Sequence, residues 1–167
     1  FLNKNLKKIL SLSSPFIEKT IYESCKIKKN VVEKDVKENN VRKILNFGHT
    51  FAHAYEASLN FSKKLNHGEA VLYGILSAIK LSKKFKSLES KEYKLILSHL
   101  SKLGFDNLNK FFKKKNLNKI VNFMIADKKN ISKKINFITL DKIGKVKINN
   151  QFSLPLVRRF IKSDMLK

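Results

Sequence analysis

The polar side chains between positions 42 and 56 follow the repeat of an α-helix. Five of them recur at steps of four, three, four and three residues: Arg42, Asn46, His49, His53 and Glu56. At about 100° per residue these side chains fall within roughly 80° of arc, which predicts one polar stripe on one helix. Apolar residues such as Ile44 and Phe51 occupy the other faces. The segment is therefore expected to bury one side and to present functional groups on another.

The chemistry of this stripe differs from that of an ordinary solvated helix face. It has no lysine and offers two imidazoles, a guanidinium, an amide and a carboxylate, a set suited to holding an anion beside a metal ion. Three of the four histidines lie between positions 49 and 67. The alternative is that the stripe simply faces water. Glu56 and Glu69 are both candidates for a carboxylate ligand, because both are close to the histidines in sequence. The sequence does not distinguish between them.

Helical patterns cover most of the remaining chain. Apolar spacing and the Ser, Pro and Asn breaks predict helices over residues 1–12, 15–38, 41–59, 67–81, 89–103, 117–127 and 156–162, with a shorter piece at 109–114. Residues 134–140 and 145–150 flank a turn and predict a β-hairpin. The expected fold class is mainly α, a helical bundle in a single domain over residues 1–167 with a small late hairpin. Gly68 and Gly74 are expected to let other backbones approach a central fourth helix.

The strongest compositional feature is a formal net charge of +23. Such a charge raises nucleic acid as a partner, and a basic helical nucleic-acid-binding module is the non-enzyme alternative. However, only Arg42, Arg158 and Arg159 among the 36 basic residues are arginine, whereas base and bidentate phosphate recognition favours arginine. The lysines are scattered along the chain together with many Asn and Ile, which share A/T-rich codons. We therefore attribute the charge mainly to compositional drift.

Two further features bear on the cellular compartment. Cys25 is the single cysteine, so no intramolecular disulfide can form and cytoplasm is the simple expectation. The nearly apolar run at 70–79 is much shorter than the roughly 20 residues that span a bilayer, so no membrane partner is expected. The chain begins with Phe1 rather than Met, which predicts that it comes from the interior of a longer gene product.

A resemblance to a known family rests on the segment KKNVVEKDVKENNVRKILNFGHTFAHAYE, which starts at Lys28, followed by HGEAV from His67. These motifs, with MIADKK from Met124 and a late hairpin containing IG, resemble the 3-dehydroquinate synthases. The resemblance implies a helical C-terminal domain that packs on an N-terminal α/β domain binding NAD. It also implies closure of 3-deoxy-D-arabino-heptulosonate 7-phosphate to 3-dehydroquinate with loss of phosphate, in the shikimate pathway to aromatic amino acids, and a homodimer. Another sugar phosphate cyclase or a metal-dependent polyol dehydrogenase of the same superfamily is the enzyme alternative.

The resemblance also assigns expected roles to single residues. His49 and His67 match two ligands of a zinc or cobalt ion, and His53 matches a histidine near the phosphate that takes part in proton transfer. Substrate contacts are implied for Lys28, Arg42, Asn46, His53 and either Lys128 or Lys129. Glu38 matches an acidic position that could orient these cations, and with His53 and Lys28 it completes the expected catalytic group. On spacing alone, by contrast, Lys28 and Asp35 are charges on a solvated helix face.

The sequence departs from the family pattern in several places. The third zinc ligand of the family, a glutamate, and the glycine-rich NAD loop both precede the point at which this chain begins. Ala52, Asn40 and Val36 replace, respectively, two glycines and an acidic residue of the pattern. The chain alone is therefore expected to bind metal weakly and to be inactive. An inactive, decayed gene product is a further alternative, which the intact polar residues of the motif argue against.

Overall fold

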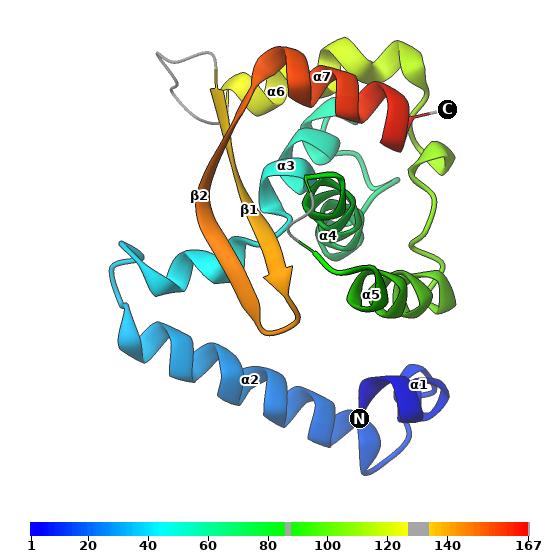
Figure 1. The fold of residues 1–167 in the computed structure, drawn as a ribbon. Helices are drawn as coiled ribbons and strands as arrows, with labels where there is room; N and C mark the ends of the chain where they lie inside the picture. Colours follow the sequence, from blue (N-terminus) through cyan, green and yellow to red (C-terminus); the bar gives the residue numbers. More distant parts are fainter. Residues whose placement is uncertain (86–87, 127–133, 167) are drawn as a thin grey trace. The chain divides into compact units, whose positions relative to one another are not determined.

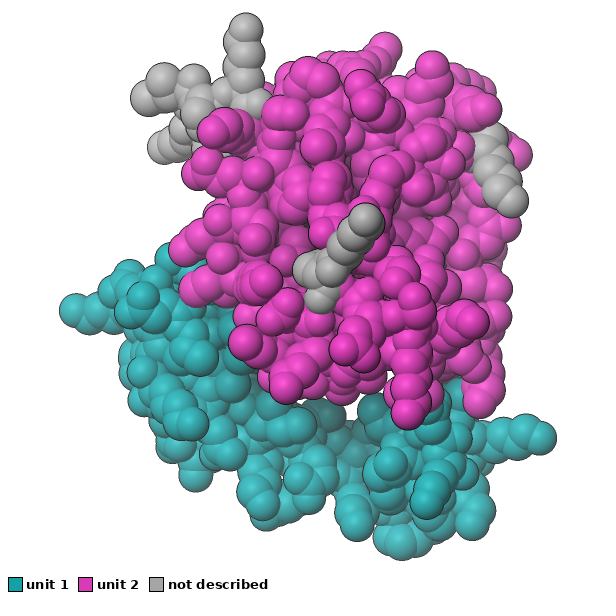
Figure 2. Space-filling model, in the orientation of Figure 1, with its two compact units in different colours: residues 1–45 teal, residues 46–167 magenta. Residues whose placement is uncertain are grey.

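The computed structural model describes residues 1–85, 88–126 and 134–166. Its contacts divide the chain into two compact units, Phe1–Leu45 and Asn46–Lys167, which are coloured separately in Figure 2. Each unit is described by itself. Within the described ranges, no helix combines the length and the apolar character needed to cross a membrane. The expectation of a single domain over residues 1–167 stays a prediction.

The first unit consists mainly of two helices, α1 (Leu2–Leu10) and α2 (Phe16–Lys34). Neither helix contains a buried residue. The predicted helix over residues 15–38 is correct at its start and wrong at its end, because α2 stops at Lys34 and Asp35 leaves the helical conformation with φ −155°. The Asp35 side chain accepts hydrogen bonds from the backbone beyond it, which favours a turn over another helical turn.

The predicted helix over residues 41–59 is interrupted. Val41–Asn46 forms a 3₁₀ helix, η1, and the α-helix α3 spans only His49–Ser58. Gly48 separates them with a left-handed φ of +85°, a conformation that glycine adopts without steric cost. The prediction of a polar stripe on one continuous α-helix is therefore wrong. His49, His53 and Glu56 remain together on α3, while Arg42 and Asn46 belong to η1.

The second unit surrounds α4 (His67–Lys84), which packs against α3, the hairpin and α5 (Ser90–Lys102), as Figure 1 shows. Short 3₁₀ helices, η2 (Leu108–Lys110) and η3 (Lys114–Asn116), precede α6 (Leu117–Ala126), which packs on α3. The central position predicted for the fourth helix is confirmed, since nine of its residues, from Ala70 to Ser82, are buried.

The late hairpin is confirmed and longer than predicted. Strands β1 (Lys134–Lys142) and β2 (Lys145–Ser153) pair antiparallel, with Lys134 opposite Ser153 and Leu140 opposite Val146. The Leu140 backbone N–H donates to Ser82 Oγ on α4 at 2.8 Å, so the hairpin is tied to the central helix. Helix α7 (Leu154–Phe160) and a π-helical turn, η4 (Ile161–Met165), close the described chain.

The core behind α3 is aromatic. Phe51 stacks on Phe137 of β1 with ring centroids 4.7 Å apart, and both rings are almost completely buried. Tyr55 is also fully buried, and its hydroxyl pairs with Ser77 Oγ of α4 at 2.6 Å. These contacts lie on the apolar side of α3. They fix the orientation of the helix and hence the direction in which its histidines point.

Two glycines set the distance between α3 and α4. A Cβ atom on Gly74 would lie 2.3 Å from the Gly48 carbonyl oxygen, and one on Gly48 would lie 2.6 Å from the Ile75 backbone nitrogen. The predicted close approach at Gly74 is therefore confirmed. The predicted close approach is wrong for Gly68, because no atom lies within 4 Å of a Cβ added there.

Candidate metal and anion site

Three imidazoles gather where α3 begins and α4 begins. His49 and His53 lie one turn apart on α3 with ring centroids separated by 5.6 Å. His67 is the first residue of α4, and its ring centroid lies 5.9 Å from that of His49 and 6.4 Å from that of His53. His49 is half-buried, whereas His53 and His67 are exposed. The packing of the two helices thus places His67 of α4 beside His49 and His53 of α3.

His49 has the properties of a neutral ligand. Its Nδ1 atom is buried and completes no hydrogen bond with the described residues. Burial lowers the pKa of the imidazole, an effect that the Phe47 backbone opposes and the imidazoles of His53 and His67 reinforce. A metal ion binds the neutral form of imidazole. Burial of His49 thus favours the neutral imidazole, which is the form that binds a metal.

The two candidate carboxylates have different structural partners. Glu56 Oε1 accepts a hydrogen bond from His67 Nδ1 at 3.0 Å. Glu69 Oε2 accepts from the Asn66 backbone N–H at 2.9 Å, across the first turn of α4. One carboxylate thus holds an imidazole and the other stabilises a helix start.

The imidazoles of His49 and His67 are donors of the kind found in metal sites. In the portion of the chain that the structure describes, no cluster of three or more His, Cys, Asp or Glu side chains could hold a metal ion. His49 and His67 nevertheless supply two imidazoles from adjacent helices, one with an unpartnered buried nitrogen and the other with a carboxylate on its second nitrogen. A carboxylate on the second nitrogen is the usual arrangement of a metal-bound histidine. The donor chemistry of His49 and His67 is compatible with a shared metal ion.

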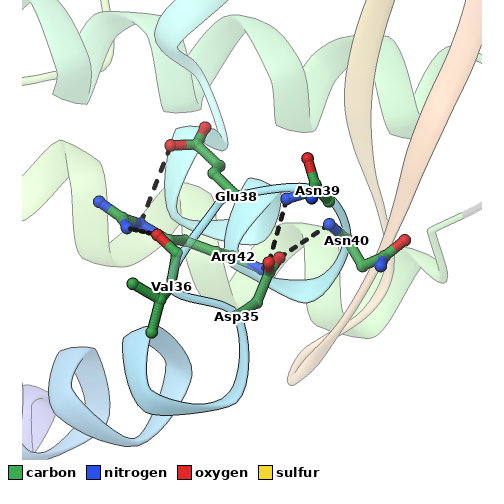
Figure 3. Close-up of polar contacts among 6 residues, drawn as sticks. All are labelled: Asp35, Val36, Glu38, Asn39, Asn40 and Arg42. Carbon is green, nitrogen blue, oxygen red and sulfur yellow. Dashed lines mark hydrogen bonds and ion pairs between the residues drawn. The ribbon is translucent and has the colours of Figure 1, made fainter.

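The loop after α2 is organised by Asp35, whose contacts are drawn in Figure 3. Its carboxylate accepts hydrogen bonds from the backbone N–H groups of Asn39 at 3.0 Å, Asn40 at 2.7 Å and Arg42 at 3.0 Å. Partial desolvation opposes ionisation of Asp35, but these backbone bonds outweigh it and hold the pKa below its usual value. The reading of Asp35 as a charge on a solvated helix face is therefore wrong. Asp35 is half-buried and shapes the loop.

Arg42 is oriented by the same loop. Its Nη1 donates to the Val36 carbonyl at 2.6 Å, and its Nε lies 3.8 Å from Glu38 Oε2 (Figure 3). The Arg42 side chain is 33% exposed, so part of the guanidinium reaches solvent. Because guanidinium has five N–H donors, donors remain for an anion. The predicted role of Glu38 in orienting a cation agrees with this pairing, although substrate contact stays a prediction.

The other predicted site residues fall elsewhere. Lys28 lies on α2 and is exposed, and Asn46 is half-buried at the end of η1. Lys128 and Lys129 lie outside the described residues. Lys28, Glu38 and Arg42 belong to the first unit, while Asn46 and the histidines belong to the second. The predicted residues thus include a histidine cluster of His49, His53 and His67, and a loop that holds Glu38 and Arg42.

Sequence reasoning missed two features of these groups. The loop role of Asp35 had an available signal, because aspartate favours turns in which its carboxylate accepts hydrogen bonds from nearby backbone N–H groups. The pairing of Glu56 with His67 had no local signal, because it joins residues 11 positions apart on two helices.

Asp35→Asn is expected to lower the melting temperature at pH 7. A carboxylate whose folded pKa lies below its usual value of about 3.9 contributes stability that is present above that value and lost as the pH falls through the folded pKa. The difference in melting temperature between wild type and Asp35→Asn should therefore shrink below about pH 4. Thermal unfolding followed by circular dichroism between pH 7 and pH 3 measures this difference in melting temperature.

Glu33→Gln is the matched control for Asp35→Asn. It removes the same charge from the same unit, at a side chain that is 62% exposed and 3.7 Å from Lys29, and exposed pairs of this kind contribute little. Equal melting temperatures for Asp35→Asn and Glu33→Gln at pH 7 would contradict the structural role of Asp35.

Two solved structures share the fold of this chain. The structure of a 2-deoxy-scyllo-inosose synthase complexed with carbaglucose-6-phosphate, NAD⁺ and Co²⁺ superimposes with a TM-score of 0.69 at 21% identity, over 81% of this chain and 38% of that protein. A second 2-deoxy-scyllo-inosose synthase structure gives a TM-score of 0.65 over the same share of this chain. This chain therefore shares the fold of part of the two 2-deoxy-scyllo-inosose synthase structures.

Sequence comparison gives the particular family. Residues 1–130 match the family model described as 3-dehydroquinate synthase C-terminal. The 3-dehydroquinate synthase of Pelagibacter ubique is 52% identical over the whole of this chain and 46% of its own length. That of Dictyoglomus thermophilum is 40% identical over 89% of this chain and 40% of its own length. The chain belongs to the 3-dehydroquinate synthase family, and it spans less than half the length of these relatives.

Proposed function

We propose that the protein containing this chain is a 3-dehydroquinate synthase, a carbon–oxygen lyase. It would convert 3-deoxy-D-arabino-heptulosonate 7-phosphate to 3-dehydroquinate with elimination of phosphate, in the cytoplasmic shikimate pathway. Family membership supports this proposal. The observation that carries it is the pair of imidazoles from α3 and α4, His49 and His67, with ring centroids 5.9 Å apart.

The proposed cofactors are NAD and a zinc or cobalt ion. When bound, NAD supplies a hydride acceptor and the metal polarises the hydroxyl that is oxidised. His49 and His67 would hold the metal, with the remaining ligands and most of the NAD contacts supplied by an N-terminal domain. A solved cyclase of this fold is described with NAD⁺ and Co²⁺, which supports the same cofactor class here. A homodimer is part of the proposal.

The chain's own polar residues would then bind and orient the sugar phosphate. Arg42, held by Val36 and Glu38, offers its free guanidinium donors to a carboxylate or phosphate. Lys28 and Asn46, and Lys128 or Lys129, would add cationic and amide contacts. His53 is exposed beside His49, where its imidazole can accept or release a proton near the phosphate. The proposed catalytic residues are His53, Lys28 and Glu38, the last acting through Arg42.

The test is the activity of the full-length protein and of its His49→Ala variant. Loss of an outer partner of a metal ligand costs about 10–100-fold, so loss of a ligand should reduce phosphate release by about 100-fold or more. The assay follows phosphate release from the heptulosonate with NAD and zinc. His99→Ala is the matched control, since His99 lies on α5 outside the imidazole cluster. Full activity in His49→Ala would refute the ligand assignment.

The fold similarity to a 2-deoxy-scyllo-inosose synthase supports a second candidate, another sugar phosphate cyclase. Substrate profiling separates the two. Turnover of a hexose phosphate but not of the heptulosonate would favour the second candidate.

A further inference from the structure

We propose that Glu56 is a positioning residue that fixes the tautomer and ring orientation of His67 and leaves Nε2 as the nitrogen that would bind a metal. The metal part of this proposal rests on the proposed function. The hydrogen bond itself does not, because it is a property of the metal-free chain: Glu56 Oε1 lies 3.0 Å from His67 Nδ1.

The carboxylate is the more firmly held partner of the pair. The Glu56 side chain is 13% exposed, whereas that of His67 is 60% exposed. Glu56 lies in the last turn of α3 between the buried residues Tyr55 and Ala57. Its backbone carbonyl also accepts from the Phe61 N–H at 2.8 Å, which ties the following loop to this turn. A largely buried carboxylate thus holds the more exposed imidazole through this hydrogen bond.

The chemistry of the two groups determines which nitrogen carries the proton. An ionised carboxylate only accepts hydrogen bonds, so Nδ1 of His67 must be the donor. In a neutral imidazole the other nitrogen, Nε2, then bears the lone pair. Histidines that bind metals commonly donate their second N–H to a carboxylate in this way. Glu56 therefore leaves Nε2 as the atom of His67 that is free to bind a metal.

Among the described residues, Glu56 is the carboxylate that pairs with the His67 imidazole. Glu69, two positions later on α4, is engaged with the Asn66 backbone. His49 and His53 approach with ring centroids at 5.9 and 6.4 Å, and a neutral imidazole is a poorer acceptor than a carboxylate. The assignment of the carboxylate role to Glu56 thus follows from the tertiary structure, which separates two glutamates that the sequence leaves equivalent.

The experiment compares Glu56→Ala, Glu56→Gln and Glu69→Gln in the full-length protein. ¹⁵N NMR of the metal-free protein reports which imidazole nitrogen of His67 is protonated, and competition with a chromophoric chelator reports the zinc affinity. In the wild type, Nδ1 should be protonated. Glu56→Ala should populate both tautomers and weaken zinc binding about 10–100-fold.

The other variants separate positioning from charge. Glu56→Gln keeps an oxygen acceptor, so it should restore the Nδ1–H tautomer and most of the zinc affinity. Glu69→Gln removes an equal charge close to His67 but keeps the helix cap, since glutamine also serves at this position. Its zinc affinity should match that of the wild type within about twofold, compared with the loss of about 10–100-fold expected for Glu56→Ala.

An unchanged His67 tautomer in Glu56→Ala, or equal zinc affinities for Glu56→Ala and Glu69→Gln, would overturn the proposal. A wild type that binds no zinc, with the tautomer shift still present in Glu56→Ala, would refute the metal in the proposed function and uphold the positioning of the ring. The two proposals can therefore fail separately.

Discussion

Gly74→Ala is expected to lower the free energy of unfolding by about 3 kcal/mol, the upper part of the range for overpacked sites. An added Cβ would lie 2.3 Å from the Gly48 carbonyl oxygen and 3.0 Å from the Ala52 nitrogen. Both atoms belong to backbone, which cannot rotate away as a side chain can, so α3 and α4 must separate. Urea unfolding followed by circular dichroism measures the change.

This substitution is expected to disturb the site as well as the fold. The cluster depends on the α3–α4 distance, because His49 starts one helix and His67 starts the other. Zinc affinity of the full-length protein should fall together with stability in Gly74→Ala, although the substituted residue is neither polar nor a ligand.

Gly68→Ala is the matched control for Gly74→Ala. Gly68 lies on the same helix, and nothing lies within 4 Å of a Cβ added there. Replacing a glycine by alanine without strain stabilises a protein by about 0.4–1 kcal/mol. Destabilisation of the same size in both variants would show that helix α4, rather than its approach to Gly48, is sensitive to substitution.

Phe51→Ala is expected to lower the free energy of unfolding by about 3–5 kcal/mol, as for other buried Phe residues replaced by alanine. Phe51 is 0% exposed and contacts the rings of Phe137 and Phe160 at centroid distances of 4.7 and 6.2 Å. The truncation would leave a cavity between α3, the hairpin and α7, and fixed surrounding helices cannot close it. For a domain of this size, the melting temperature should fall by about 2–4 °C per kcal/mol.

Phe61→Ala removes the same ring at a position that is 76% exposed. It should change the free energy of unfolding by no more than about 0.5 kcal/mol, as is usual for surface positions. A loss in Phe61→Ala that equals that of Phe51→Ala would contradict the assignment of the core to the aromatic side of α3.

The core and the imidazoles share one short helix, so stability and site geometry are coupled in this part of the molecule. Phe51 and Tyr55 hold the inner side of α3, while His49, His53 and Glu56 lie on its other side. The half-buried His49 occupies the boundary between the two sides. A substitution on the inner side therefore affects the direction of the ligands without contacting them.

The helix over residues 41–59 illustrates the limit of local periodicity. The spacing of polar residues predicted one continuous helix, and the part from His49 to Ser58 is confirmed. The interruption at Gly48 was not predicted, because it lies where Gly48 packs against the backbone of Gly74, 26 residues later, and local spacing carries no signal of that contact. Periodicity reports which side of a segment is apolar. It does not report where another segment approaches too closely for an α-helix to continue.

The end of α2 shows a related error. Charged residues near Asp35 fit a solvated helix, and the turn signal in Asn39 and Asn40 placed the predicted helix end at residue 38, four residues after the observed end at Lys34. Three backbone N–H groups converge on the Asp35 carboxylate. A hydrogen-bonded loop of this kind competes with helix propagation because it satisfies backbone donors that a helix would otherwise satisfy.

By itself the sequence determined the mainly helical class, the late hairpin, the family and the identities of the two candidate metal ligands, because periodicity and motif order are local properties of the chain. The tertiary structure alone decided how these residues meet. It placed the ring centroids of His49 and His67 5.9 Å apart, and it paired Glu56 with an imidazole and Glu69 with the start of a helix. It also placed the interruption between η1 and α3 where the backbones of Gly48 and Gly74 pack together. These outcomes depend on packing between segments distant in sequence, and packing distances are set by the atoms of both partners rather than by either one.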